Sequence, residues 1–304
     1  MKRVTAPHAR SSGAALVLAM LLTALGAAVA VQMIVPLSGW LDREHRARDT
    51  QASYTLADAA ASWATTVLVA DLRQGPVDHY GELWATPLPP TPVEGGSIEG
   101  RITDLQARFN LNSLAPRGVK SAANVALAKA LFATASLPPV LVDTLADAID
   151  RDDTTDDGQS ERQRYGQPLR NAPLREVADL LEVPGFGAEQ VRALAALVVV
   201  LPEATPINVN TASAATLSAA FPATNRELFA AAVARRERQP FTSPGEFATL
   251  LQQPPLDGVL STGTQFFAVD AVIRFERAAH RVQLRIARPP NGRAQVISRL
   301  ISHA

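Results

Sequence analysis

An acidic loop is the part of this sequence best suited to chemistry. Residues 150–161 read Asp-Arg-Asp-Asp-Thr-Thr-Asp-Asp-Gly-Gln-Ser-Glu. Calcium takes roughly six to eight oxygen ligands and tolerates irregular geometry, so this composition suits a calcium ion. Counting from Asp153, the loop begins like an EF-hand, but Arg164 stands at the twelfth position, where an EF-hand has a bidentate glutamate. The loop is therefore not an EF-hand, and it is either an irregular calcium site or a solvated acidic turn.

Groups that carry catalysis are scarce in this chain of 304 residues. It has no cysteine, which excludes a disulfide, a thiol nucleophile and a cysteine zinc site. Its 29 basic and 29 acidic residues balance and create no global field for nucleic acid. We expect no enzyme, and a hydrolase using two acidic-loop carboxylates is the weaker alternative. The five histidines are scattered, without an H-x-x-x-H pair or a nearby Gly-x-Ser-x-Gly motif: His8, His45, His79, His280 and His303.

The N-terminus reads as a membrane signal. A leader with Lys2, Arg3 and Arg10 precedes an apolar run from Ala14 to about Val35, close to the ~20 residues that a membrane-spanning helix needs. The run exceeds the roughly 7–15 apolar residues of a signal peptide. Because the leader is purely basic, we expect one pass through the inner membrane, with the N-terminus cytoplasmic and the C-terminal domain periplasmic. An ordinary anchor or an uncleaved signal peptide is the simpler interpretation.

Beyond this run, the periodicity predicts an α+β head. Apolar residues at helical spacing extend a helix over 41–72. Prolines between 87 and 92 end any helix before a short alternating strand at 97–103. Between these parts and the C-terminus lies a long block rich in alanine and leucine, which predicts a helical insertion. Three more strands are expected at 266–272, 282–287 and 294–301, with Pro289-Pro290-Asn291-Gly292 as the turn of the last hairpin.

The helical block contains two similar units. In the first, Val183-Pro184-Gly185-Phe186-Gly187 precedes a helix predicted to run through Val198; in the second, Ile207–Ala212 opens a helix. Both resemble helix-hairpin-helix or SAM-like modules. Their DNA-binding forms combine a glycine hairpin with basic residues that bind phosphates. Here the first unit has the glycines and the second has the arginines. A membrane-anchored DNA receptor of the competence type is thus an alternative, and it would depend on Arg235, Arg236 and Arg238.

The leader is similar to a type IV prepilin leader, which a prepilin peptidase cuts after a glycine while the apolar helix stays attached. On that resemblance the cut falls between Gly13 and Ala14, and Ala14 becomes the mature, N-methylated terminus. Most members carry a glutamate at the fifth mature position, where this chain has Leu18. Leu18 matches the exceptional member of the family.

Taken in order, these motifs resemble the minor pseudopilins of the GspK family in type II secretion. The resemblance covers nearly the whole chain. The motifs are the leader through Gly13, Leu18, Asp104–Asn112, the acidic loop, Tyr165, Pro168–Ala172, Val183–Phe186 and Ile207–Ala212.

The resemblance implies a pseudopilin fold, in which a long N-terminal transmembrane helix lies on a small antiparallel sheet, with a large all-α domain of SAM-like units inserted. The expected divisions are a leader (1–13), a transmembrane helix (14–37), a first pseudopilin part (38–106), a first SAM-like unit with the acidic loop (107–205), a second unit (206–265) and C-terminal strands (266–304).

The resemblance also implies structural calcium in the acidic loop. The positions carried over are Asp150, Asp152, Asp157 and Glu161, although Gly158-Gln159-Ser160-Glu161 departs from the usual family run. The implied partners are minor pseudopilins of the I and J types, the major pseudopilin filament, the prepilin peptidase and the inner-membrane platform of type II secretion. No nucleic acid is expected.

A tip position explains Leu18 physically. In a pseudopilus the fifth-position glutamate is thought to neutralise the charged N-terminus of the subunit ahead. A tip subunit has no subunit ahead, so a carboxylate there would be buried unpaired, at a cost of several kcal/mol. The resemblance therefore implies a subunit that initiates the pseudopilus and supports export across the outer membrane.

Overall fold

The computed structural model describes residues 12–304 except 95, 255, 257 and 276–277. The chain divides into two compact units, one ending at Leu56 and one spanning Ala57–Ala304. A single helix, α1 (Ser12–Leu72), enters both units. It confirms the predicted helix beyond the apolar run. Within Ala57–Ala304 one face of α1 is buried, with Ala57, Ala64 and Leu68 fully covered. Small side chains on this face allow close approach of neighbouring elements.

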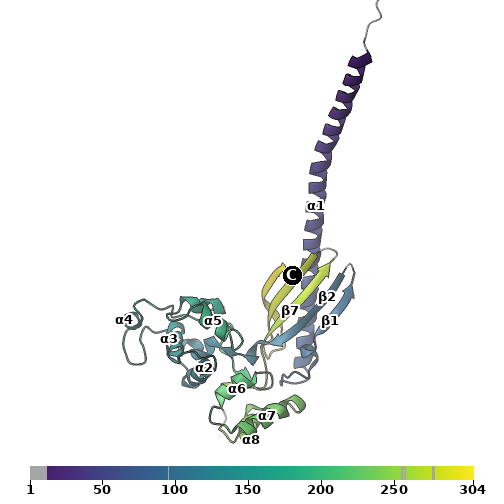
Figure 1. The fold of residues 1–304 in the computed structure, drawn as a ribbon. Helices are drawn as coiled ribbons and strands as arrows, with labels where there is room; N and C mark the ends of the chain where they lie inside the picture. Colours follow the sequence, from purple (N-terminus) through teal and green to yellow (C-terminus); the bar gives the residue numbers. More distant parts are fainter. Residues whose placement is uncertain (1–11, 95, 255, 257, 276–277) are drawn as a thin grey trace, which may run out of the picture. The chain divides into compact units, whose positions relative to one another are not determined.

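Five antiparallel strands form a sheet within Ala57–Ala304, in the order β1-β2-β7-β8-β9 (Figure 1). They are β1 (Leu88–Val93), β2 (Gly96–Asp104), β7 (Phe266–Phe275), β8 (Ala278–Ala287) and β9 (Gln295–His303). The last four include the strands expected from sequence. The proline-rich segment, which the sequence predicts only to end a helix, forms β1. A proline cannot donate a ladder hydrogen bond, and β1 lies at an edge of the sheet where this is tolerated.

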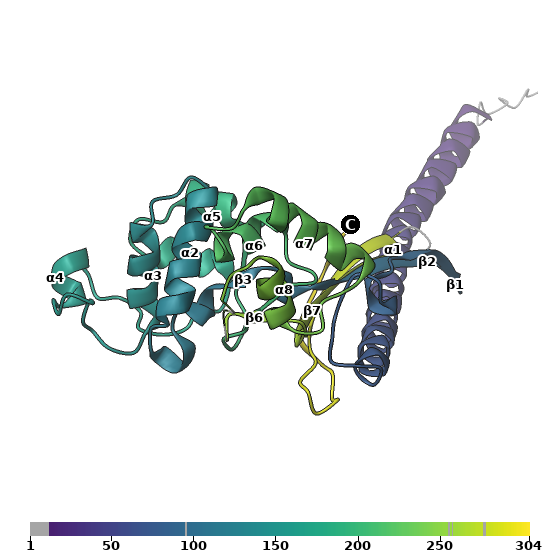
Figure 2. The same cartoon turned by 90° about the horizontal axis from the view of Figure 1, so that it is seen from below.

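The helical block is inserted between β2 and β7, which are hydrogen-bonded neighbours in the sheet. Figure 2 shows α2, α3 and α5 toward one end of the block and α7 and α8 toward the other, with α6, which packs against α2, between them. Their bounds are α2 (Ala122–Thr134), α3 (Val140–Ile149), α4 (Glu161–Tyr165), α5 (Ala188–Leu194), α6 (Ala214–Ala220), α7 (Arg226–Arg238) and α8 (Pro244–Leu250). Short 3-10 helices at 105–107, 111–114, 116–118 and 177–182 join them, and another at 83–85 precedes the sheet.

Two predicted helix limits were wrong. The helix expected through Val198 ends at Leu194, and Val198–Val199 forms β4, which pairs in parallel with β3 (Phe109–Asn110). In the second SAM-like unit Ile207–Asn208 is β5, parallel to β6 (Leu260–Ser261), and α6 begins only after Ser213. Ser213 is the N-cap, since its hydroxyl accepts the backbone N–H of Thr216. Long-range strand pairing thus overrides the helical periodicity.

The two SAM-like units of the block repeat one device, a pair of buried asparagines of which the first ends a short strand and the second follows two residues later. In the first unit the Asn112 side chain donates to the carbonyls of Leu174 (2.9 Å) and Leu201 (2.8 Å) and accepts from the Leu174 N–H. In the second unit Asn210 donates to the Phe241 carbonyl and accepts from its N–H, at 3.0 and 2.9 Å. Each amide satisfies backbone groups that would otherwise be buried without partners.

Asp104 connects the sheet to the second SAM-like unit. Its buried carboxylate accepts from the hydroxyl of Thr264 at 2.6 Å, from the Asn208 amide at 3.1 Å and from the Thr211 hydroxyl. Burial raises the pKa of Asp104, whereas these hydrogen bonds act in the opposite direction. The network holds the second SAM-like unit at the end of β2, beside the point where the chain returns to the sheet as β7.

Candidate functional site

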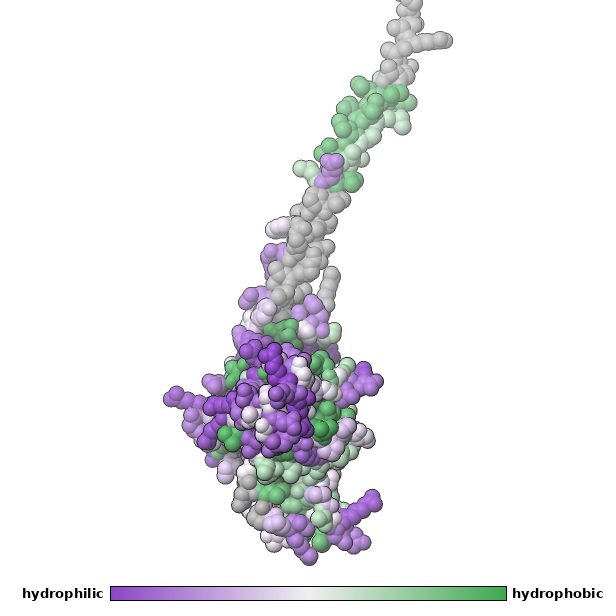
Figure 3. Space-filling model, turned by 90° about the vertical axis from the view of Figure 1, so that its left-hand side faces the viewer, coloured by the Kyte–Doolittle hydropathy of each residue, from purple (hydrophilic) through white to green (hydrophobic). Residues whose placement is uncertain are grey.

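The first candidate site is the exposed apolar part of α1. Ala15–Met33 is long and apolar enough to cross a membrane, with a mean hydropathy of 2.2 and none of the segment buried. Figure 3 shows it as a hydrophobic band along the helix. The hydroxyl of Thr23 donates to the carbonyls of Ala19 (3.1 Å) and Met20 (2.9 Å), so its polar group is satisfied within the helix. Length and composition therefore suit a membrane anchor.

Gly13 and Ala14, the predicted cleavage pair, lie in the first turn of α1, which begins at Ser12. The basic leader residues Lys2, Arg3 and Arg10 lie outside the described residues. Leu18 lies on the described helix with 62% of its surface exposed, so its side chain faces the surroundings of the anchor.

The second candidate site lies where α3 ends and α4 begins. Asp150 caps the end of α3, and Glu161 opens α4 after the acidic loop. One carboxylate oxygen each of Asp150, Asp152 and Glu161 lie within 4.8 Å of one another. Asp150 and Glu161 are 1% and 2% exposed, whereas Asp152 is open to solvent. The fold thus gathers three carboxylates from loop and helix at one partly buried point.

Unsatisfied oxygens mark this point. Asp150 Oδ1, Glu161 Oε1 and Asn171 Oδ1 are buried without a hydrogen-bond donor among the described residues. The Asn171 amide nitrogen donates to the Asp152 carbonyl, which leaves its oxygen free to accept. Buried acceptors without partners are costly, and a hard cation satisfies several of them at once. The donor set fits a calcium ion.

The electrostatics of the cluster lead to the same conclusion. Burial raises the pKa of Glu161 to about 7 and that of Asp150 to about 6, and the Lys120 ammonium limits the rise at Asp150. Lys120 Nζ lies 3.3 Å from Asp150 Oδ2 and 2.9 Å from Asp156 Oδ1, and it also pairs with Asp147. One lysine shared by three carboxylates leaves Glu161 and Asp152 without a cationic partner among the described residues. A bound divalent cation would reverse the raised pKa values.

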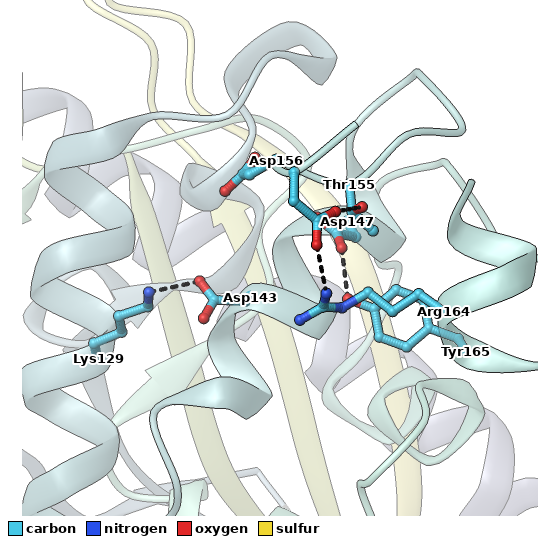
Figure 4. A pocket seen from close by; sticks show the side chains of 8 residues that line it. Lys129, Asp143, Asp147, Thr155, Asp156, Arg164 and Tyr165 are labelled. Atoms are coloured by element: carbon cyan, nitrogen blue, oxygen red, sulfur yellow. Dashed lines mark hydrogen bonds and ion pairs between the residues drawn. The ribbon is translucent and has the colours of Figure 1, made fainter. Parts of the chain in front are cut away.

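Asp157, the remaining predicted ligand, lies apart from this cluster. Its carboxylate accepts from the Thr155 hydroxyl and pairs with Arg164 Nη1 at 3.0 Å. Asp157 lines the adjoining pocket, in which Figure 4 shows Arg164 and Thr155, and there the Tyr165 hydroxyl donates to Asp147 at 2.5 Å. The structure therefore brings together three of the four predicted ligands. The Asn171 side chain, which donates to the Asp152 carbonyl, is a further candidate ligand, and its place in the Pro168–Ala172 motif was the available sequence signal.

The arginines of the DNA-binding alternative are engaged within the protein. Arg236 Nη1 donates to the carbonyls of Val209 (2.9 Å) and Ala212 (2.6 Å). Arg235 pairs with Glu246 at 3.5 Å and lies over the ring of Phe241, 4.9 Å from its centroid. Only Arg238 of the three is exposed and without an ion pair among the described residues. Arginines held in this way stabilise the second unit and are poorly placed to bind phosphates.

Comparisons with known proteins agree with this geometry. Two family models described as "Type II secretion system (T2SS), protein K" match residues 107–203 and 207–270. "Type II secretion system protein K" of Pseudomonas aeruginosa is 32% identical and covers 78% of this chain and 76% of its own length. The Klebsiella pneumoniae protein of the same name is 31% identical, over 70% of this chain and 71% of its own length. These matches include both helical units, and the DNA-binding alternative is not supported.

A solved structure has a similar fold. It is the GspK-GspI-GspJ complex from the type 2 secretion system of enterotoxigenic Escherichia coli, with a TM-score of 0.68 and 24% identity. The likeness covers 84% of this chain and 99% of the other. It confirms the α+β pseudopilin fold with an apolar N-terminal helix and a helical insertion. From the family models, the relatives and the fold together, the chain belongs to the type II secretion system protein K family, the GspK minor pseudopilins.

Proposed function

We propose that this chain is the tip subunit of a type II secretion pseudopilus. The observation that carries the proposal is the insertion of about half the chain between β2 and β7, two strands that are neighbours in the sheet. A block of this size beside a pseudopilin sheet would clash with neighbouring subunits if the chain lay in the middle of a helical filament. At the tip, one side of the subunit has no neighbour to clash with.

Leu18 supports the same position. In a mature chain beginning at Ala14 it is the fifth residue, where a glutamate would pair with the N-terminus of the subunit ahead. The helix around it is apolar and exposed over Ala15–Met33. A carboxylate in hydrocarbon without a partner would cost several kcal/mol, and leucine avoids this cost.

The anchor and leader define the proposed location. The chain crosses the inner membrane once through α1, with the leader cytoplasmic and the head periplasmic. A prepilin peptidase cuts between Gly13 and Ala14 and the new terminus is methylated. The chain performs no catalysis of its own, and its proposed role is assembly and export.

Minor pseudopilins of the I and J types are the proposed partners, with the major pseudopilin filament below them and the inner-membrane platform as the assembly site. The support is the similar fold of the solved structure, in which the Escherichia coli protein forms a complex with GspI and GspJ. The exposed apolar surface of α1 is the proposed contact within the membrane.

A structural calcium ion is proposed at the acidic loop, held by Asp150, Asp152, Glu161 and Asn171. The ion would satisfy the buried oxygens and hold the start of α4 against the end of α3. Asp157 is the least suited of the four expected ligands because Arg164 and Thr155 already occupy its carboxylate.

Intact mass tests the pseudopilin role most directly. The full chain is purified from membranes with and without a coexpressed prepilin peptidase, and a Gly13→Val variant is the control. The expected result is a methylated species beginning at Ala14 that appears only with the peptidase and is lost in the variant. An unprocessed chain, or cleavage beyond the apolar run, would contradict the proposal.

The tip position needs a second experiment. Coexpression with I-type and J-type partners should give a complex of one copy of each chain, which native mass spectrometry measures. Incorporation of many copies along a filament would contradict a tip role even if processing is correct.

A further inference from the structure

A groove lies over the outward face of the sheet, between the strands and the start of the inserted block. It has a volume of about 520 Å³. Its floor comes from β2, β7, β8 and β9, and its walls include Leu105, Arg108, Arg175 and Glu176. The alternation of the strands fixes this side, because Val269, Leu284 and Ile286 are buried on the inner face while Asp270 and Gln283, which pair across β7 and β8, face outward.

Positive charge dominates the groove. Four arginines line it, against two carboxylates: Arg101, Arg108, Arg175 and Arg285, with Asp270 and Glu176. Arg281 already holds Asp270 through two hydrogen bonds, one of 2.8 Å from Nε. Arg101 lies 3.9 Å from the same carboxylate. Over the described part of the chain, Arg108, Arg175 and Arg285 have no ion pair.

Two of these arginines are half-buried and repel each other. Burial lowers the pKa of Arg108, and the charge of Arg285 lowers it further. Asp104 acts in the other direction, but it is itself buried and held by Thr211, Thr264 and Asn208. Among the described residues, the Arg285 side chain donates to the Val200 carbonyl alone, at 3.3 Å. Like charges held together without a counter-ion are unfavourable, and a carboxylate between them would remove the repulsion.

The groove also has an exposed apolar residue and an edge strand at one side. Leu300 on β9 lies opposite Gln283 on the outward face and is 58% exposed. β9 is an edge strand of nine residues, Gln295–His303, without proline, whereas the opposite edge strand β1 contains three prolines. Prolines protect an edge from pairing with another chain, and β9 lacks this protection. The free edge of β9 faces away from β8, the strand that carries Arg285.

We propose that this groove binds an extended acidic segment of another protein, with carboxylates at Arg108 and Arg285 and an aliphatic side chain on Leu300. A densely charged polyanion fits less well, because Asp270 and Glu176 also face the groove. A peptide with spaced carboxylates satisfies the arginines and avoids these two groups. The proposal goes beyond the tip role and does not depend on it.

Peptide selection on the purified full chain in detergent tests the proposal. A displayed library of random ten-residue peptides is selected on the unaltered chain and on an Arg108→Gln/Arg285→Gln variant. The expected pool from the unaltered chain is enriched in peptides with two or more Asp or Glu residues and an aliphatic residue. A pool without acidic enrichment, or the same pool from both proteins, would overturn the proposal.

Titration of one selected peptide gives the magnitude. Replacing its carboxylates by amides, or using the double arginine variant, should weaken binding at least tenfold. Arg192→Gln on α5, an exposed arginine outside the groove, is the matched control and should bind normally. Thermal melting of each variant verifies folding. If the double variant unfolds, Arg175→Gln, at an exposed position, replaces it. Stronger displacement by inorganic phosphate or a short DNA duplex than by free peptide would show a general anion surface and overturn the peptide assignment.

Discussion

Arg288 Nη1 lies 2.8 Å from Asp71 Oδ2, although 217 residues separate the two in sequence. The same guanidinium pairs with Asp78 and donates to the carbonyls of Thr264 (2.9 Å) and Leu68 (3.2 Å). All three charged side chains are at least 93% buried. This buried group ties the end of α1 to the end of β8, and thereby the first and last parts of the head to each other.

Replacing Arg288 by methionine should strongly destabilise the head. The two aspartates would remain buried without a cation, which typically costs about 3–5 kcal/mol. Thermal melting of the full chain in detergent, followed by tryptophan fluorescence, to which the buried Trp84 contributes, should show a loss of roughly 6–20 °C. Arg299→Met is the matched control, because it removes an ion pair with the exposed Asp58 and should change little. Equal effects of the two variants would refute the structural role of Arg288.

Calcium should raise the melting temperature through Glu161 and not through Asp157. At a calcium concentration of about 100 times Kd the stabilisation is about 2.7 kcal/mol. Glu161→Gln and Asn171→Ala should each remove most of this increase. Asp157→Asn should keep it, since the carboxylate of Asp157 is held by Arg164. Loss of the calcium effect in Asp157→Asn alone would favour the ligand set expected from sequence.

The calcium effect should depend on pH. Burial raises the pKa of Glu161 to about 7 and of Asp150 to about 6, so the folded site binds protons that the unfolded chain has released. Without calcium, these groups therefore reduce stability as pH rises from about 4 to 7. With calcium the trend reverses, because the ion requires both carboxylates ionised. Melting curves should show a large calcium shift at pH 7.5 and almost none at pH 5.

Gly185 should be less tolerant of substitution than Gly158, although both have a left-handed backbone with φ of +88° and +78°. In Gly185→Ala the new Cβ would lie 2.7 Å from Leu141 Cδ2, whereas nothing lies within 4 Å of a Cβ at Gly158. Both variants incur the left-handed strain of roughly 1–2 kcal/mol. Only Gly185→Ala should lose further stability beyond this strain. Denaturation of the full chain measures the free energy of unfolding of each variant. Equal losses would indicate that Leu141 moves aside at no cost.

Leu18→Glu should impair initiation at the tip. A carboxylate without a partner in the membrane costs a few kcal/mol, and each 1.4 kcal/mol is about a factor of ten. Secretion by a host that has this chain as its only K-type pseudopilin should fall at least tenfold. Leu18→Met is the control and should secrete normally. Unimpaired secretion with glutamate would mean that the residue at this position does not select the tip.

Local signals in the sequence determined the elements. The apolar run fixed the start of α1, because hydropathy depends only on composition, and alternation fixed β2 and β7–β9. The order of motifs indicated the family, and the density of acidic residues located the candidate calcium loop. The inferences about the elements and the acidic loop use only nearby residues, whereas the family inference uses the order of motifs along nearly the whole chain.

Only the tertiary structure decided which distant residues meet. The prolines of β1 became a strand because β2 lies beside them, and Val198–Val199 left the helix to pair with Phe109–Asn110. Asp157 lies apart from the carboxylate cluster because Arg164 binds it, while Asn171, from beyond α4, donates to the Asp152 carbonyl. The sequence showed neither the Arg288–Asp71 pair nor the convergence of Arg108 and Arg285, because burial and charge depend on the long-range packing of the whole head.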